Sequence, residues 1–205
     1  MLYSLQEIFT HIYKTQSWGN DETISGSGSR IQETQGLIHV LPEFMKVLGV
    51  QSFLDLGCGD FNWLQYMDLA GVQYIGSEIV PELVEQNQAN YGSPNLEFRH
   101  LDMTHDPLPP VDLILIRDCL THFSFVQIMR TLNNLKQSDF KYILITNYSE
   151  LLFNSNIDNG FWRPLNLTRA PFHLPKPVKL IPEFAEGKSL GLWQKQEFEN
   201  LDFKS

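Results

Sequence analysis

The sequence predicts an α/β protein: one domain with a mostly parallel seven-stranded sheet and helices on both faces. Two patterns alternate along the chain: short apolar runs typical of buried strands, and longer stretches with the 3.6-residue spacing of amphipathic helices. Strands that alternate with helices are joined by right-handed crossovers, which makes the strands parallel. The 205 residues, 42% of them hydrophobic, suffice for one globular core.

Five runs are expected to form the parallel strands, because each is short, apolar and followed by polar or glycine residues. They span residues 52–57, 72–77, 96–102, 111–118 and 141–147. Two further runs, 177–184 and 189–198, flank the sequence AEGK and predict a C-terminal antiparallel hairpin.

Helical spacing predicts helices between these strands and before them, near residues 5–13, 31–48, 61–70, 81–91 and 125–137. Ser29 with Gln32, and Ser124 with Gln127, have the spacing of capping boxes. Pro42 is expected to bend or restart its helix. Two long polar or irregular segments are expected to be loops, 17–30 and 154–175.

Charge and composition exclude several classes of function. The net charge is −9 and no basic run is present, so binding to nucleic acid or to an anionic membrane is not expected. Residues 1–14 lack the pattern of a signal peptide, and no stretch approaches the roughly 18 apolar residues of a membrane span. Two cysteines exclude a disulfide framework and a cysteine-based zinc site. We expect a cytoplasmic monomer or homodimer.

The stretch FLDLGCGDFNW at residues 53–63 places a glycine turn directly after the first strand. Gly57 and Gly59 let the backbone bend and approach a ligand at the carboxyl end of the sheet. A dinucleotide site has a third glycine where Asn62 stands, and the phosphate-binding motif is absent. A nucleophile elbow is also excluded, because Leu56 and Asp60 replace the glycines that would flank Cys58. Cys58 is therefore interpreted as a small packing residue.

Three acidic residues lie at the carboxyl ends of the first three predicted strands: Asp55, Glu78 and Asp102. A carboxylate about 20 residues after such a glycine turn is well placed to accept the hydroxyls of a ribose. Acidic residues are common at strand ends, but three in corresponding positions favour a ligand that contains a nucleoside.

With these acids in place, the sequence resembles the class I S-adenosylmethionine-dependent methyltransferases. The resemblance rests on FLDLGCGDF (53–61), YIGSEIV (74–80), FRHLDMT (98–104), VDLILIRDCLTH (111–122) and KYILITN (141–147). It implies a Rossmann-like domain that binds S-adenosylmethionine and releases S-adenosylhomocysteine. The segments W-G…S-G-x-G-S, CGDFNW, RDCLTH and GFWRPLNL…PF further resemble an uncharacterised bacterial subfamily.

The resemblance implies a single methyltransferase domain over residues 1–205. Its parts are an N-terminal helical cap or lid (1–48), a donor-binding core (50–150), a substrate-side loop (151–175) and the C-terminal hairpin (176–205). Trp18, in the loop of the cap, is expected to pack over the ligand.

The resemblance also implies roles for single residues. The donor would lie over the turn formed by Asp55, Gly57, Cys58, Gly59 and Asp60. Glu78 would hold the ribose diol, Ile79 would pack on the adenine, and Asp102 with the Met103 amide would read the adenine edge. Arg117 and Asp118 would face the methionyl end. Many family members have a third glycine where this chain has Phe61, so the path of the backbone near the amino-acid moiety of the donor is expected to differ from theirs.

Methyl transfer requires the acceptor and the methyl group in line at about 3–3.5 Å, and in some cases a base. His122 is the preferred base, since its unperturbed pKa of about 6.5 suits proton transfer near neutrality. The alternative is a histidine that hydrogen-bonds at the start of the next helix. Asp118 is the second candidate base. His100 and His105 flank Asp102, but strand alternation separates neighbouring side chains, so no metal site is expected.

The acceptor is expected under the loop after the fifth strand, with contacts from Trp162, Arg163, Asn166 and His173. These side chains offer stacking, carboxylate binding and hydrogen bonds, which fits a sugar, carboxylate or peptide-like acceptor. Alternatively, the aromatic residues of this loop cover the sheet.

The expected function is methyl transfer to a small-molecule or glycan-like acceptor, preferably at oxygen. Two alternatives remain open: a module that binds the donor without catalysis, and an NAD(P)-dependent oxidoreductase. The second is disfavoured by Asn62 and by the absence of a Tyr-x-x-x-Lys pair.

Overall fold

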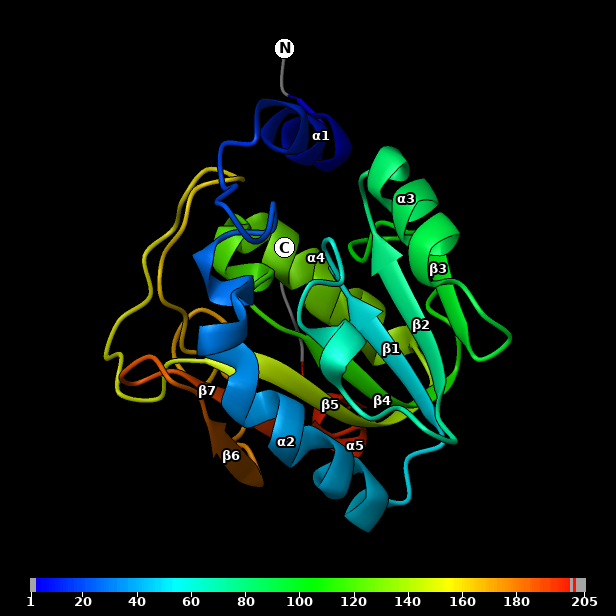
Figure 1. Cartoon of the computed structure of the whole chain (residues 1–205). Coiled ribbons are helices and arrows are strands. Elements are labelled where there is room, and N and C mark those ends of the chain that lie inside the picture. The colour runs from blue at the N-terminus through cyan, green and yellow to red at the C-terminus, as the bar shows by residue number, and fades with distance from the viewer. Residues whose placement is uncertain (1–2, 200, 202–205) are drawn as a thin grey trace. The chain divides into compact units, whose positions relative to one another are not determined.

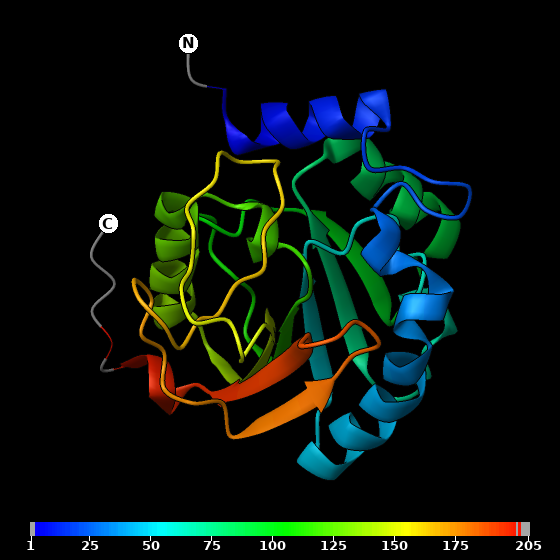
Figure 2. The same cartoon turned by 90° about the vertical axis from the view of Figure 1, so that its left-hand side faces the viewer.

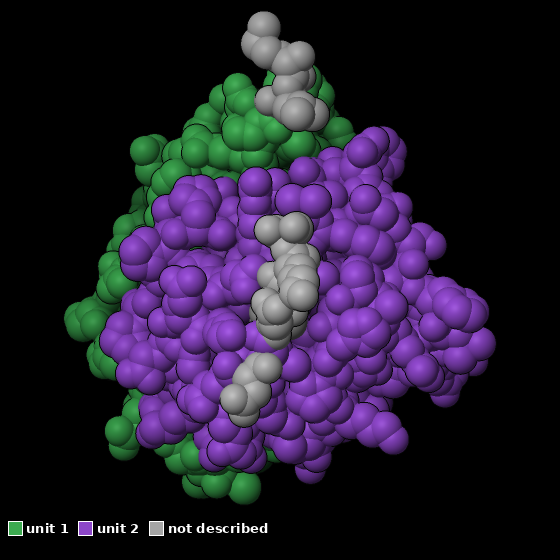
Figure 3. Space-filling model, turned by 180° about the vertical axis from the view of Figure 1, so that it is seen from behind, with its two compact units in different colours: residues 1–101 green, residues 102–205 purple. Residues whose placement is uncertain are grey.

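The computed structural model describes residues 3–199 and residue 201 (Figure 1). The chain divides into two compact units, Met1–Leu101 and Asp102–Ser205, which Figure 3 colours separately. Within the described residues, seven strands form a sheet in the order β3-β2-β1-β4-β5-β7-β6. The predicted α/β class, with a mostly parallel seven-stranded sheet and antiparallel strands at its C-terminal end, is confirmed.

The first unit is a parallel three-stranded segment with helices. Its strands are β1 (Ser52–Leu56), β2 (Gln73–Glu78) and β3 (Leu96–His100), and β2 pairs with both neighbours. Its helices are α1 (Leu5–Thr15), α2 (Ile31–Leu48) and α3 (Pro81–Tyr91). A capping box of Ser4 and Glu7 begins α1, and Pro81 stands in the first turn of α3, which packs on β2 and β3 (Figures 1 and 2).

The second unit contains the other four strands. They are β4 (Val111–Ile116), β5 (Phe140–Asn147), β6 (Lys179–Pro182) and β7 (Ser189–Gln194). β4 and β5 are parallel, whereas β7 runs antiparallel to both β5 and β6. Helix α4 (Phe125–Gln137) contacts the short helix α5 (Gln196–Glu199). Residues 113–116 of β4 are fully buried, as expected for an apolar central strand.

The helix predicted near residues 61–70 is wrong. Only a single 3-10 turn, η2 (Leu64–Tyr66), forms there. Phe61 has a φ of 58°, a left-handed conformation that interrupts a right-handed helix. The first strand-to-helix connection is therefore mostly irregular, and its polar groups bind other parts of the chain.

Neither predicted capping box caps its helix through its own side chains. Ser29 lies in the 3-10 turn η1 (Ser27–Ser29), and Arg30 precedes α2 without a side-chain cap. The carboxylate of Glu22 instead accepts the N–H of Ile31 at 2.7 Å. Ser124 does precede α4, but the side chains that accept its first N–H groups are Asn159 and Asn156. The second helix continues without interruption through Pro42.

Residues 148–178 contain no helix or strand, so the predicted loop, 154–175, is irregular and extends further at both ends. Part of the loop belongs to the core of the second unit, because Leu165, Leu167, Phe172 and Leu174 are buried. Phe161 and Trp162, in contrast, are exposed by 67% and 56%. No helix in the described part of the chain is long and apolar enough to cross a membrane.

Candidate active site

The glycine turn after β1 is held against the end of β2. The N–H groups of Gly57 and Cys58 both donate to the carbonyl of Ser77, at 2.9 and 3.0 Å. Gly59 has a φ of 58°, and a Cβ at this position would lie 2.2 Å from Ser25 Oγ. Glycine is therefore required here both by the backbone conformation and by the close approach of another segment.

Two side chains in and before this turn, Asp55 and Cys58, are buried. Asp55 is 3% exposed and accepts a hydrogen bond from the Tyr74 hydroxyl at 3.1 Å. Burial raises the pKa of the Cys58 thiol, and the charges of Asp55 and Glu78 raise it further. A thiol with a raised pKa stays protonated at neutral pH, which supports the packing role predicted for Cys58. Asn87 of α3, which sequence reasoning missed, donates to the Gly59 carbonyl at 2.7 Å.

Glu78 is the last residue of β2, and its carboxylate lies across the glycine turn. One oxygen accepts the N–H of Ile79 at 2.8 Å, and the other accepts the N–H of Gly59 at 3.2 Å. Burial raises the pKa of Glu78, although these N–H donors partly oppose the shift. The carbonyl of Ile79 is bound by His100 Nε2 at 3.0 Å. Thus the predicted ribose-binding acid stands beside the predicted donor-binding turn.

Asp60 fastens the loop between α1 and α2 to the glycine turn. Its carboxylate accepts hydrogen bonds from the Thr23 hydroxyl, the Ile24 N–H and the Ser25 hydroxyl, all between 2.8 and 2.9 Å. The Asp60 N–H donates in turn to Ser25 Oγ at 2.9 Å. Thr23 is 2% exposed, so this contact is largely shielded from water.

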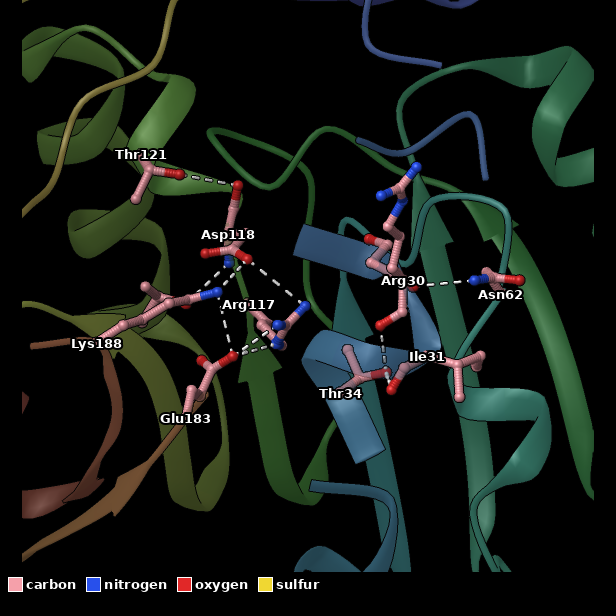
Figure 4. Close-up of polar contacts among 11 residues, drawn as sticks. Arg30, Ile31, Thr34, Asn62, Arg117, Asp118, Thr121, Glu183 and Lys188 are labelled. Carbon is pink, nitrogen blue, oxygen red and sulfur yellow. Dashed lines mark hydrogen bonds and ion pairs between the residues drawn. The ribbon is translucent and has the colours of Figure 1, made fainter. Parts of the chain in front are cut away.

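Asn62 makes the second fastening of the same loop. Its side-chain amide donates to Glu22 at 2.8 Å and to the carbonyl of Ser29 at 2.9 Å. Nearby, at the start of α2, the Thr34 hydroxyl donates to the carbonyl of Arg30, as Figure 4 shows. In the sequence Asn62 only excluded a dinucleotide site; the structure gives it a structural partner 40 residues away.

Two other residues, Trp18 in the loop between α1 and α2 and Phe61 after the glycine turn, pack against aromatic rings. Trp18 lies edge-on to Phe9 of α1, with ring centroids 5.7 Å apart. Phe61, where many family members have glycine, is 2% exposed despite its left-handed backbone. Its ring contacts three aromatic side chains, Tyr74, Tyr91 and Phe98. This packing offsets the backbone strain at Phe61, which is of order 1 kcal/mol.

Asp102 and Met103 lie just beyond β3, which ends two residues earlier than predicted. Asp102 accepts hydrogen bonds from the N–H of Thr104 at 2.8 Å and from its hydroxyl at 2.6 Å. Met103 is buried, and Asn134 of α4 binds its carbonyl at 3.0 Å. The described residues contain no cluster of three or more histidine, cysteine or acidic side chains suited to a metal ion.

Arg117 and Asp118 directly follow β4 and belong to a buried ionic network with Glu183 and Lys188, which the sequence analysis did not identify (Figure 4). Burial alone raises the pKa of Asp118, but Arg117 and Lys188 outweigh burial and hold that pKa below its usual value. A carboxylate stabilised in this way is a weak base.

His122 lies in the 3-10 turn η3 (Leu120–His122). Its Nδ1 is 3.0 Å from the carbonyl of Phe161, and because a carbonyl only accepts, Nδ1 is the protonated nitrogen. Burial lowers the pKa of His122 to about 4, with only partial opposition from the Phe161 hydrogen bond and the Asp118 charge. The ring is therefore neutral at pH 7, with its lone pair on Nε2.

This pKa predicts an acid-dependent loss of stability. The pKa of His122 is about 4 in the folded chain and about 6.5 in the unfolded chain. As pH falls from 6.5 toward 4, only the unfolded chain takes up a proton at His122, so the free energy of unfolding decreases; above pH 6.5 this loss is absent. Urea unfolding from pH 7.5 to 4 should show up to about 3 kcal/mol more loss for the natural chain than for His122→Gln. Equal losses in the two proteins would contradict the assignment.

Tyr148, just after β5, lies near Asp118 and was not identified from the sequence. Burial and the charges of Asp118 and Glu183 raise its pKa to about 12. Its ring lies edge-on to that of Trp162, with centroids 6.4 Å apart. The second unit therefore has an ionisable and aromatic group near Asp118.

The four loop residues predicted to bind the acceptor differ in their surroundings. Arg163 donates to the carbonyls of Ser155, Leu120 and Phe123, and burial lowers its pKa to about 10. The amide of Asn166 is bound to loop backbone, including the carbonyls at 149 and 151. Trp162 and His173 are exposed. Composition did not distinguish the residues that hold the loop from those that face outward.

Comparisons with known proteins agree with this geometry. Residues 53–138 match a family model described as a methyltransferase domain. No curated protein sequence matches the chain. Human N-acetylserotonin methyltransferase in complex with S-adenosylmethionine is similar over 93% of this chain and 59% of its own, with 16% identity and a TM-score of 0.58.

Two further solved structures share the fold. Magnesium protoporphyrin IX methyltransferase from Synechocystis PCC 6803 aligns over 93% of this chain and 96% of its own, at 12% identity and a TM-score of 0.61. A family 2 O-methyltransferase from Planctomyces limnophilus, in complex with apigenin, aligns over 69% and 49%, at 22% identity and a TM-score of 0.51. The chain thus spans about half the length of some similar proteins and nearly all of another.

Proposed function

We propose that the chain is a class I S-adenosylmethionine-dependent methyltransferase and that it methylates an oxygen of a small organic acceptor. Residues 53–138 match a methyltransferase domain model, and the chain shares its fold with solved methyltransferases. The observation that carries this proposal is the environment of His122. Its imidazole is neutral and is oriented by the carbonyl of Phe161. Phe161 and the next residue, Trp162, have exposed aromatic side chains.

The residues of the glycine turn fit the donor. Gly57 and Gly59 carry no side chain of their own, and the Glu78 carboxylate lies at hydrogen-bond distance from the Gly59 N–H. We assign the ribose diol to Glu78 and retain Asp55, Ile79, Asp102 and Met103 as donor-binding residues. When bound, S-adenosylmethionine supplies a methyl group on a sulfonium, which needs no further activation.

His122 is proposed as the base in preference to Asp118. The lowered pKa of Asp118 reflects its pairing with two cations, which makes proton uptake unfavourable. His122 Nε2 carries a lone pair throughout the neutral range and is not neutralised by a cation, although burial, which lowers the pKa of His122 to about 4, makes it a weaker base than a free imidazole. As the acceptor oxygen bonds to the methyl carbon, the carbon–sulfur electrons remain on sulfur and the acceptor proton passes to Nε2.

Exposed aromatic side chains favour a flat or apolar acceptor. Phe161 and Trp162 are exposed, whereas Arg163 and Asn166 bind loop backbone, so we now assign acceptor contacts to Trp162 and His173. Two similar enzymes are named for N-acetylserotonin and magnesium protoporphyrin IX, and a third structure holds apigenin. All three compounds are small organic molecules.

An acceptor panel tests this function. We expect S-adenosylhomocysteine release with at least one hydroxylated compound among apigenin, simple phenols and sugars, and a loss of at least about a hundredfold in His122→Gln. The product mass and its fragmentation identify the methylated atom. Donor binding without turnover on any compound would favour the non-catalytic alternative, and methylation at nitrogen would contradict oxygen specificity.

A further inference from the structure

Tyr148 is the first residue after β5, and its backbone is fixed on both sides. Its N–H donates to the carbonyl of Leu165 at 2.8 Å, and its carbonyl accepts the N–H of Leu151 at 3.0 Å. Leu165 is fully buried, so the first of these bonds ties Tyr148 to the core of the second unit. The side chain is half-buried, and its hydroxyl forms no hydrogen bond with any residue that the structure describes. Tyr148 therefore combines a fixed backbone with a hydroxyl that is available to water or to a ligand.

Trp162 is exposed, but the backbone on either side of it is bound to the 3-10 turn η3. The N–H of Gly160 donates to the carbonyl of His122 at 2.9 Å, and the N–H of Arg163 donates to the carbonyl of Thr121 at 3.1 Å. The buried guanidinium of Arg163 adds two hydrogen bonds of 2.8 Å to the carbonyls at 120 and 123. The exposed indole therefore projects from a fixed stretch of backbone, which is what a binding contact requires.

The side chains of Tyr148 and Trp162 together form what we call the aromatic corner. Their ring centroids are 6.4 Å apart, and the planes of the two rings are inclined at 80°. The indole remains 56% exposed, so the contact with Tyr148 covers only part of it. Aromatic rings bind flat aromatic ligands by offset stacking or by edge contacts, and two rings nearly at right angles offer both at once. The aromatic corner therefore suits a flat aromatic ligand.

The charges around the Tyr148 hydroxyl decide which ligand group it can bind. Burial and the carboxylates of Asp118 and Glu183 raise the pKa of Tyr148 to about 12, and Arg117 opposes this shift only in part. The hydroxyl therefore keeps its proton at neutral pH and can donate it to a ligand oxygen. A negative charge on the ligand would be disfavoured by the same two carboxylates. The ligand oxygen that suits this position is thus a neutral one, in a carbonyl, an ether or a hydroxyl.

The segment that carries Trp162 also orients the proposed base. His122 Nδ1 donates to the carbonyl of Phe161, the residue directly before Trp162, at 3.0 Å. The carbonyl of His122 in turn accepts the N–H of Gly160. Two hydrogen bonds therefore join the base to the residues that directly precede the indole. The aromatic corner and the proposed base thus share one stretch of the second unit, so a ligand held at the aromatic corner lies against the segment that orients His122.

We propose that Tyr148 is a specificity-determining residue, which donates a hydrogen bond to a neutral oxygen of a flat aromatic acceptor that lies against the indole of Trp162. This inference deepens the proposed function and rests on it. The acceptor class is a phenol with a second, uncharged oxygen on or beside the ring. Phenols without that oxygen bind more weakly, and phenols that carry a carboxylate in its place bind most weakly.

Ligand titration by NMR at pH 7.5 tests this, with S-adenosylhomocysteine present so that no methyl group is transferred. The probes are 4-hydroxyacetophenone, 4-ethylphenol and 4-hydroxybenzoate. We expect the first to bind the natural chain about three- to tenfold more tightly than the second, and the third to bind most weakly. Tyr148→Phe keeps the ring and should remove the preference for 4-hydroxyacetophenone while leaving the affinity for 4-ethylphenol unchanged. Trp162→Leu should weaken both, and Phe153→Leu, at an aromatic residue of the same loop that is 82% exposed, should match the natural chain.

The preference between the two neutral phenols separates a role in specificity from a role in the fold. An equal loss for both phenols in Tyr148→Phe would show that Tyr148 acts only through the structure of the loop and would overturn the inference. An unchanged preference in Tyr148→Phe, or no binding of any probe by the natural chain, would overturn it as well. Methylation of an oxygen by a natural chain that lacks this preference would overturn the inference alone. Selective phenol binding without methyl transfer from S-adenosylmethionine would instead overturn the proposed function alone.

Discussion

Glu78→Ala is expected to weaken the binding of S-adenosylmethionine about a hundredfold. Two hydrogen bonds from a ribose diol to a carboxylate contribute about 1.5–3 kcal/mol each, and about 3 kcal/mol corresponds to a hundredfold change in Kd. Glu78 is the acid at the end of β2 whose carboxylate lies beside the glycine turn. No nearby acid in the described part of the first unit contacts Gly59 in the same way.

The measurement is titration calorimetry with S-adenosylmethionine and with S-adenosylhomocysteine. Glu78→Gln keeps the shape and one accepting oxygen, so its loss should be smaller than that of the alanine variant. Because Glu78 also accepts N–H groups of Gly59, Ile79 and Val80, thermal unfolding must show that each variant is folded. Glu82→Gln is the matched control, since Glu82 is an exposed partner of Lys14. An unchanged Kd in Glu78→Ala would refute the ribose assignment.

The fold was predictable because its determinants are local and repetitive. The strands β1, β2, β4 and β5 are apolar runs bounded by polar residues, and their ends differ from the expected ones by one or two residues. The terminal hairpin followed from two such runs around a short turn. Helix α3 could be located because Pro81 marks its first turn.

The connection after β1 could not be predicted because distant residues decide its conformation. The left-handed backbone of Phe61 is stabilised by rings of Tyr74, Tyr91 and Phe98, which come from β2, α3 and β3. A helical hydrophobic pattern contains no information about such contacts. For the same reason the caps of α2 and α4 were misassigned: Glu22 and Asn159 reach them from other segments.

In the candidate site, too, local motifs could be predicted from the sequence, whereas contacts between distant residues could not. Gly57, Gly59 and Glu78 form a local motif, and the structure places Glu78 at hydrogen-bond distance from Gly59. Lys188 and Glu183 are 70 and 66 residues from their partners, and in the sequence they look like the charged ends of a solvent-exposed turn. Arg163 shows a different limit of the sequence, because an arginine that binds loop carbonyls has the same sequence signature as one that binds a carboxylate.

Asp60→Ala is expected to lower the free energy of unfolding by about 2–4 kcal/mol, because Asp60 holds the loop between α1 and α2. The substitution removes the acceptor of three hydrogen bonds to a charged group, and it leaves the buried hydroxyl of Thr23 without an acceptor for its proton. The Ser25 hydroxyl beside Gly59 also loses its acceptor and keeps only the backbone N–H of residue 60 as a donor. Since the loop then keeps only the Asn62 contacts and the backbone N–H of residue 60, it is held less firmly at the glycine turn, and donor affinity should fall as well.

Urea unfolding gives the free energy, and limited proteolysis shows whether cleavage begins within residues 17–30. Asp60→Asn keeps one accepting oxygen and should lose less stability, whereas Asp68→Ala, in an exposed turn, should change it by less than about 0.5 kcal/mol. A double-mutant cycle with Thr23→Val isolates the contact, because the two substitutions share one hydrogen bond and their effects should not add. Additive effects, with no new cleavage in the loop, would show that Asp60 does not hold the loop to the turn.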